Sequence, residues 1–432
     1  MKRRLLLLVG PIAALALVCQ SPPVEEEPEQ QQEEDDDDES WQPPTPITED
    51  DRNPLILVGI DGVKHSYLER YESSTPNLNH LADQGVVAES LKPVFPSYTF
   101  PNLYSIVTGL YPDNHGIISN TVYDPVRDET LRMSDTDAQE DPEWWGGEPI
   151  WVTAERHELR TGTFFWVGSQ AKINDVRPTH FAPYDSSIPH TQRTEEVIDW
   201  LTADEPVDFA TLYFASPDFA GHESGTESDD LDSALEGIDN QIGRLVNRLD
   251  DEGLWPDVNL LIVSDHGMTN TDEDKVVFLD DKIDLRDVDV IEWTPVSMIA
   301  PEEGKADEIY DQLREHDDHY EVYRRDDLPE RYRLGTGRRV PEIIVVADKP
   351  YTLTSRPFYN QEGIFGGDHG YDPEYRDMHG IFIADGPDLP DGHQTETLEI
   401  VDLYPLMSYL LALEPAAHDG SLERIGPAIF GD

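Results

Sequence analysis

Short apolar runs alternate with longer amphipathic stretches along the chain from Pro54 onward. Four of these runs have the length of a buried strand, namely Leu55 to Ile60, Val207 to Phe214, Val258 to Val263 and Ile343 to Val346. A further stretch places apolar residues at helical spacing, at Leu231, Leu235, Ile238, Ile242, Leu245 and Leu249. The alternation predicts an α/β fold with a largely parallel central sheet and helices on both of its faces.

Two segments interrupt this alternation. Residues 121–148 and residues 271–340 are loop-rich or mixed in pattern, and we expect them to be insertions around a crevice at the sheet. The second segment contains the apolar run Val296 to Ala300 and predicts a small cap region. Its apolar content is too modest to predict an independent domain.

The first residues have the composition of an export signal. Residues 1–19 begin with basic side chains, continue with an apolar stretch too short to predict a membrane span, and end at Cys19. Cys19 is the only cysteine, so an intramolecular disulfide is excluded. Its position resembles the lipidated cysteine of bacterial lipoproteins, although Val18 departs from the small residue preferred there. We expect an extracytoplasmic protein of the cell envelope, anchored to a membrane surface through Cys19 or otherwise secreted.

Acidic residues dominate both the next segment and the whole chain. Residues 20–51 are rich in acids and prolines and predict a disordered linker, which leaves residues 52–432 as the folded domain. The chain has 90 Asp and Glu residues against 31 Lys and Arg residues, a formal net charge of -59. Such a surface repels polyanions and argues against binding of long nucleic acids.

Candidate metal ligands are placed at the ends of apolar runs. They are Asp61 in LILVGIDG, Asp218 and His222 in SPDFAGH, Asp265 and His266 in LLIVSDHG, and His379 in MHGIFIA. In an α/β protein, side chains beyond the carboxyl ends of parallel strands meet at one crevice. Mixed Asp and His donors suit Zn²⁺ better than Mg²⁺ or Ca²⁺, although Mn²⁺ or Co²⁺ could use the same ligands. The pattern predicts two divalent metal ions, and we favour Zn²⁺.

Thr99 is the candidate nucleophile. It precedes Pro101 by two residues, and proline is favoured in the first turn of a helix. A threonine there is either a plain capping residue or a hydroxyl that faces the positive end of the helix dipole, which favours an oxyanion.

The sequence around Thr99 favours the second interpretation. PSYTFPNLYSIVTGLYPDNHGIISN resembles the nucleophile segment of the nucleotide pyrophosphatase/phosphodiesterase family in the alkaline phosphatase superfamily. IDG, PDFAGHESG, SDHGM, GDHGYD and MHGIFIA occur in that family's order, and the resemblance covers roughly residues 53 to 430. It implies an alkaline-phosphatase-like fold and a metal-dependent hydrolase. This enzyme would cleave nucleotide phosphodiester or phosphoanhydride bonds through a threonyl intermediate and release a nucleoside 5′-monophosphate.

The resemblance also implies roles for individual residues. One metal site would comprise Asp61, Thr99, Asp265 and His266, and the other Asp218, His222 and His379. Asn120 would donate to a phosphate oxygen, and Phe100 would line the nucleotide pocket. Phe181, or else Tyr184, would supply the opposing ring. We interpret His369 as a residue that orients the loop before His379 and not as a ligand.

Alternative functions use the same ligands. A choline-phosphodiester or lysophospholipid phosphodiesterase and a phosphate monoesterase could both be built on this metal core. An envelope binding protein with a degenerate site is disfavoured by the complete set of candidate ligands. A sulfatase is disfavoured, because it needs a cysteine or serine oxidised to formylglycine, and the nucleophile segment contains no such cysteine.

Overall fold

An eight-stranded sheet forms the centre of the computed structural model, which describes residues 41, 44, 46–315 and 319–431. Its strands, in spatial order, are β19 (His393–Thr395), β2 (Val86–Ala88), β18 (Phe382–Asp385), β9 (Asn259–Val263), β1 (Leu55–Ile60), β8 (Phe209–Phe214), β6 (Thr161–Phe164) and β7 (His180–Ala182). β18 is antiparallel to its neighbours β9 and β2, and the other pairings are parallel. The predicted α/β class and the three predicted strands at β1, β8 and β9 are therefore confirmed.

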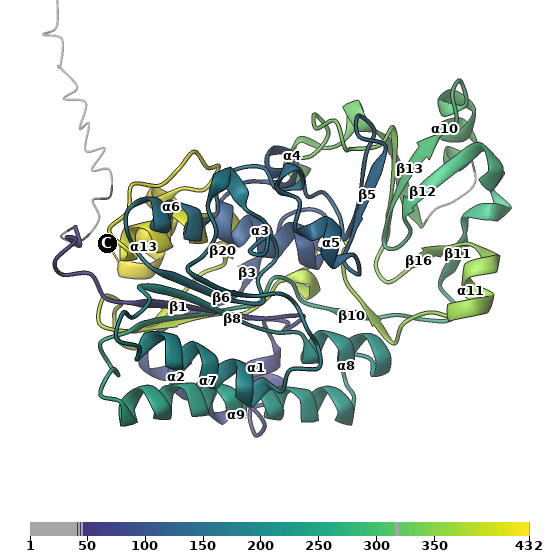
Figure 1. Ribbon diagram of the computed structural model, residues 1–432. Coiled ribbons are helices and arrows are strands. Elements are labelled where there is room, and N and C mark those ends of the chain that lie inside the picture. Colours follow the sequence, from purple (N-terminus) through teal and green to yellow (C-terminus); the bar gives the residue numbers. More distant parts are fainter. Residues whose placement is uncertain (1–40, 42–43, 45, 316–318, 432) are drawn as a thin grey trace, which may run out of the picture. The chain divides into compact units, whose positions relative to one another are not determined.

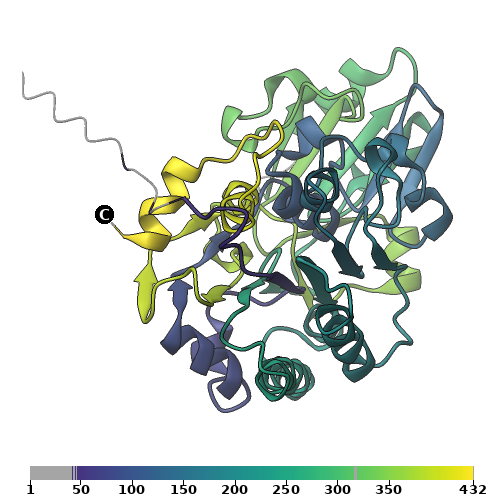
Figure 2. The same cartoon turned by 60° about the vertical axis from the view of Figure 1, so that its left-hand side comes forward.

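Helices cover both faces of this sheet (Figure 1). On one face lie α2 (Pro76–Gln84), α7 (His190–Leu201) and α9 (Asp229–Asp251), and in Figure 2 the two teal helices α7 and α9 are seen nearly end-on, side by side. On the other face lie α3 (Thr99–Thr108), α6 (Ile150–Arg156), α12 (Leu403–Leu410) and α13 (Leu422–Phe430). The remaining helices are α1 (Tyr67–Arg70), α4 (Pro112–His115), α5 (Thr136–Gln139), α8 (Ser216–Ser224), α10 (Ala306–Arg314) and α11 (Arg356–Glu362).

Helix α9 shows how the sequence pattern produces these layers. Its side chains at the six predicted apolar positions are all buried. Ser228 caps the amino end, where its Oγ accepts a hydrogen bond from the Leu231 N–H at 3.2 Å. Capping and one apolar stripe fix both the start of the helix and the face that it turns to the sheet.

A smaller antiparallel sheet has its own apolar core. Its order is β12 (Val288–Glu292), β13 (Val296–Pro301), β15 (Ile343–Ala347) and β14 (Tyr320–Arg324), and α10 packs against it. The run from Ile343 to Val346, which we expected in the central sheet, thus belongs here, because its partners are β13 and β14. The insertion therefore extends beyond residue 340 and includes the pair β11 (Val276–Phe278) and β16 (Thr352–Thr354).

Three short strand pairs complete the described structure. They are β4 (Thr121–Asp124) with β5 (Glu129–Arg132), β3 (Leu91–Lys92) with β20 (Leu398–Glu399), and β10 (Thr269–Asn270) with β17 (Gly367–Asp368). The first pair lies in the predicted insertion 121–148.

Trp41, the first described residue, packs against the carboxyl-terminal helix α13. Trp41 stacks on Phe430 with ring centroids 6.5 Å apart, and its indole N–H donates to the Gly431 carbonyl at 3.2 Å. The predicted signal sequence with Cys19 and most of the predicted linker lie outside the described residues. Within the described part, no helix has the length and apolarity to span a membrane.

Two glycines of α9 give a test of this packing. A Cβ on Gly237 would meet nothing within 4 Å, whereas a Cβ on Gly243 would lie 2.6 Å from Asn77 Oδ1. The Asn77 amide is held in place because it donates to Asp239 at 2.7 Å. We expect Gly237→Ala to stabilise the fold by about 0.5–1 kcal/mol through helix propensity. Gly243→Ala should destabilise it by about 1–3 kcal/mol through overpacking.

Thermal unfolding followed by circular dichroism measures both changes. Opposite shifts of the midpoint support the packing of α2 on α9. A rise of the midpoint for both variants would contradict it.

Candidate metal centre and active site

Three carboxylates are delivered to one point by neighbouring strands. Asp61 follows β1, Asp265 comes two residues after β9, and Asp218 lies in the first turn of α8, directly after β8. Because β8, β1 and β9 are parallel neighbours, their carboxyl ends lie side by side. Gly62 permits the close approach, since its φ is +71° and a Cβ there would lie 2.8 Å from the Asp218 Cα.

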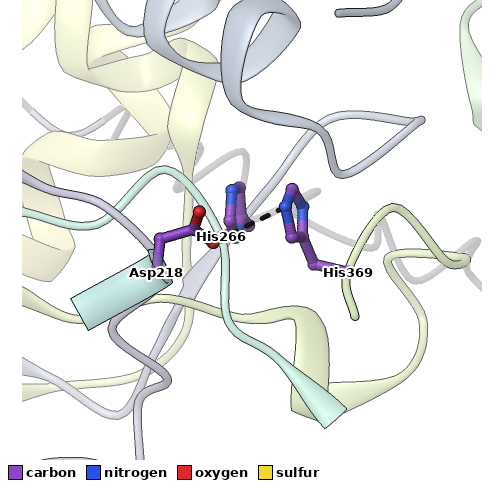
Figure 3. A group of neighbouring side chains, drawn as sticks. All are labelled: Asp218, His266 and His369. Atoms are coloured by element: carbon purple, nitrogen blue, oxygen red, sulfur yellow. Dashed lines mark ion pairs between the residues drawn. The ribbon is translucent and has the colours of Figure 1, made fainter. Parts of the chain in front are cut away.

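The carboxylates form two overlapping groups with histidines. Asp61, Asp265 and His266 make one group, and Asp218, His266 and His369 make the other; within each group the potential ligand atoms lie within 4.8 Å of one another. All five residues are buried. Figure 3 shows Asp218, His266 and His369 converging, and the His266 and His369 rings are stacked with centroids 3.5 Å apart. His222 joins the second group, with its Nε2 3.4 Å from Asp218 Oδ1.

The histidines are held with one defined nitrogen toward the carboxylates. The Nδ1 atoms of His222, His266 and His369 each lie 2.9 Å from a backbone carbonyl, of Gly367, Gly267 and Ser97 respectively. A carbonyl accepts only, so each Nδ1 carries a proton, and in the neutral imidazole each Nε2 presents a lone pair. This arrangement, a backbone acceptor behind the imidazole, is typical of histidines that bind metal ions.

Three carboxylate oxygens lie beside these nitrogens without any described group that compensates their negative charge. Asp61 Oδ1, Asp218 Oδ1 and Asp265 Oδ2 are buried and have no hydrogen-bond partner among the described residues. His266 Nε2 lies 3.2 Å from Asp61 Oδ1 and 3.3 Å from Asp265 Oδ2. Burial, and then the charge of Asp61, raise the pKa of Asp218 and of Asp265 well above the usual range. The donor set therefore fits divalent cations, which would offset the repulsion between these oxygens.

His379 is not part of this cluster, contrary to our expectation. Its Nδ1 is hydrogen-bonded to Ser90 Oγ at 2.9 Å, and its Nε2 lies 2.8 Å from the Pro373 carbonyl. Both ring nitrogens are thus occupied, and neither is left to bind a cation. His369, which we had interpreted as an orienting residue, supplies the third imidazole instead. Its Nε2 lies 3.6 Å from Asp218 Oδ1.

Thr99 lies against the first group. Its Oγ1 is 3.2 Å from His266 Nε2, and the residue is 3% exposed. Thr99 is the first residue of α3 rather than its cap, a position that Tyr98 takes. Asn120 is close by, because its Oδ1 accepts from the Phe100 N–H at 2.9 Å. This bond orients the amide and leaves Nδ2 as its donor.

A mainly apolar cavity of about 120 Å³ opens beside Thr99 and the carboxylates. Phe100 and Tyr184 both line it, together with Phe165, Trp166 and the exposed Phe219. Phe181 does not line it, contrary to our preference. Ala182 on β7 faces the cavity, and side chains alternate along a strand, so Phe181 faces away and packs under Arg177.

Tyr213 is a site residue that we did not predict. Its hydroxyl donates to Asp61, and burial, followed by the charge of Asp61, raises its pKa well above the usual range. It therefore stays a donor and orients the Asp61 carboxylate. The only signal in the sequence is its penultimate position in strand β8, five residues before Asp218.

Comparison with known proteins gives consistent matches. The family model for type I phosphodiesterase / nucleotide pyrophosphatase matches residues 55–372, a region that includes His369 and ends before His379. Human ectonucleotide pyrophosphatase/phosphodiesterase family member 5 is 35% identical over 377 residues, covering 87% of this chain and 78% of that protein. Human bis(5′-adenosyl)-triphosphatase is 38% identical over 371 residues, covering 85% and 80%.

Solved structures agree with these matches. Murine ectonucleotide pyrophosphatase/phosphodiesterase 5, in an inactive threonine-to-alanine variant in complex with AMP, superposes with a TM-score of 0.83 at 33% identity. The match covers 87% of this chain and 100% of that one. The alkaline-phosphatase-like α/β fold expected from the sequence is confirmed by this likeness.

The two histidines give a direct test of the ligand set. His369→Ala should lower the metal content from about two ions per chain to about one, because it removes an imidazole from the second group. His379→Ala, a matched buried histidine, should keep both ions. Inductively coupled plasma mass spectrometry after zinc loading and desalting measures the stoichiometry. Loss of an ion from His379→Ala but not from His369→Ala would restore the assignment made from the sequence.

Proposed function

The chain belongs to the type I phosphodiesterase/nucleotide pyrophosphatase family of enzymes, and we propose that it hydrolyses nucleotides through a covalent intermediate on Thr99, releasing a nucleoside 5′-monophosphate. The observation that carries this proposal is the position of Thr99. Its buried hydroxyl lies between the carboxylate–imidazole cluster and the apolar cavity. A nucleophile in this position reaches a phosphorus atom whose nucleoside occupies the cavity.

We propose that the cluster holds two Zn²⁺ ions. Asp61, Asp265, His266 and Thr99 would hold one ion, and Asp218, His222 and His369 the other. When bound, the ions would neutralise charge on the phosphoryl group and lower the pKa of the threonine hydroxyl. The choice of zinc rests on the mixed oxygen and imidazole donors.

The reaction then takes two displacements at phosphorus. In the first, a bond forms between Thr99 Oγ1 and phosphorus as the bond to the leaving oxygen breaks; the leaving group departs with the electron pair and the threonine proton passes to solvent. In the second, water attacks phosphorus, the bond to Oγ1 breaks, and threonine is regenerated with the nucleoside monophosphate. Asn120 Nδ2 would donate to a non-bridging oxygen, an effect typically worth about 3–4 kcal/mol in the transition state.

The cavity supports a nucleoside as the retained half of the substrate. Phe100 and Tyr184 supply aromatic surface, and base stacking on such rings tolerates different bases. The murine relative binds AMP, and the human relative named above is a bis(5′-adenosyl)-triphosphatase. We therefore propose nucleoside phosphoanhydrides, bis(5′-adenosyl) triphosphate among them, as substrates.

Replacing Thr99 tests the covalent step. Thr99→Ala should reduce turnover of bis-p-nitrophenyl phosphate to less than about one hundredth, because the nucleophile is lost, while two metal ions stay bound. Thr108→Ala is the matched control, a buried threonine of the same helix whose hydroxyl donates to the Tyr104 carbonyl and accepts from the Leu110 N–H, away from the carboxylates. Residual activity of Thr99→Ala above about one hundredth would show that another group attacks phosphorus.

A substrate panel separates the proposed activity from its rivals. Bis-p-nitrophenyl phosphate and bis(5′-adenosyl) triphosphate should be turned over faster than p-nitrophenyl phosphate or p-nitrophenyl phosphorylcholine. Preference for the third compound would indicate a phosphate monoesterase, and preference for the fourth a choline phosphodiesterase.

We propose, from the amino-terminal sequence alone, that the enzyme acts outside the cytoplasm and is anchored through acyl chains on Cys19. Cys19→Ser should then move the protein from the membrane fraction to the soluble fraction, as immunoblotting after ultracentrifugation would show. An unchanged distribution would indicate an uncleaved signal anchor or an ordinary secreted form.

A further inference from the structure

An exposed aromatic ring lies against His222, one of the residues that would hold the second ion. Phe365, between α11 and β17, is 53% exposed, and its ring lies against His222 with centroids 4.7 Å apart. The backbone around it is fixed, because the Gly366 N–H donates to the His222 carbonyl at 2.6 Å and the Phe365 carbonyl accepts from the Thr271 hydroxyl. The backbone that carries this ring is therefore fixed beside His222.

The contacts of Phe365 indicate which part of a substrate it could touch. Contacts connect Phe365 to His222, His222 to Asp218, and Thr99 to His266. In an in-line displacement, the leaving oxygen departs opposite the attacking oxygen. His222 and Phe365 do not line the cavity that the retained nucleoside would occupy, so the space beside them is available to the leaving group. The retained nucleoside occupies the cavity of Phe100 and Tyr184, which Phe365 does not line.

We propose that Phe365 is the platform of a leaving-group subsite, on which the second base of a dinucleotide stacks. This inference rests on the proposed function, since it assumes that a nucleoside phosphate is transferred to Thr99. One exposed planar ring supported by an imidazole suits the flat face of a base. An acyl chain would need an apolar groove, and the apolar cavity described at this site is lined by Phe100 and Tyr184 and not by Phe365.

Binding to a protein that cannot turn over its ligand tests this subsite. In the zinc-loaded Thr99→Ala background, isothermal titration calorimetry would compare bis(5′-adenosyl) triphosphate with ATP, whose leaving half has no base. Phe365→Ala should raise the Kd of the dinucleotide roughly tenfold, the effect expected for loss of one base–aromatic stack. The Kd of ATP should change less than about twofold, and Phe365→Trp should retain the affinity for the dinucleotide.

Phe358→Ala is the matched control. Phe358 lies on α11 and is 44% exposed, but its ring packs near Trp293 and not on a residue of the cluster. It should leave both dissociation constants unchanged.

The results of these titrations distinguish failure of the Phe365 subsite from failure of the proposed hydrolytic activity. Equal weakening of both ligands by Phe365→Ala would mean that the ring acts through His222, and it would overturn the proposal. So would unchanged dinucleotide affinity, or absence of dinucleotide binding in the Thr99→Ala background. The proposed function fails separately, if the unsubstituted protein binds these nucleotides and does not hydrolyse them.

Discussion

The structure depends on a buried concentration of negative charge. One carboxylate oxygen each of Asp61, Asp218 and Asp265 lies buried without a hydrogen-bond donor among the described residues, and the Nε2 atoms of three histidines lie beside these oxygens. Burying unpaired carboxylates together is costly, so the arrangement is favourable only with positive charge between them. Cation binding and folding are coupled in such a site, because the unfolded chain has no preformed set of ligands.

The surrounding structure serves to hold these groups in register. Three parallel strands carry the carboxylates, and backbone carbonyls fix the histidines from behind. The smaller sheet contributes as well, because the Tyr98 hydroxyl donates to the Thr294 carbonyl at 2.7 Å and accepts from the Val296 N–H at 3.1 Å. Tyr98 immediately precedes Thr99, so the insertion is joined directly to the start of α3. The insertion therefore helps to position Thr99.

Helices and strands that are set by one local hydrophobic pattern could be predicted from the sequence. Sheet membership and side-chain partners, which are set by tertiary contacts, could not. The runs at β1 and β9 and the stripe of α9 were predictable, because local patterning and burial coincide there. The run at Ile343 to Val346 was predictable as a strand, but nothing local says which sheet it joins. His369 and His379 are each followed by glycine. Only the partners of their ring nitrogens, set by distant segments, show which imidazole faces the carboxylates.

The stacking of Trp41 on Phe430 fixes the place where the described chain enters the folded domain. α13 packs beside β19, where His393 Nε2 lies 2.8 Å from the Ala428 carbonyl, and this helix lies at the end of the sheet away from α8 (Figure 1). The polypeptide thus joins the domain at the amino ends of the parallel strands, while Thr99 and the carboxylates stand at their carboxyl ends. A bulky group attached at Trp41 would therefore lie at the end of the sheet away from Thr99 and would leave the cavity beside Thr99 accessible.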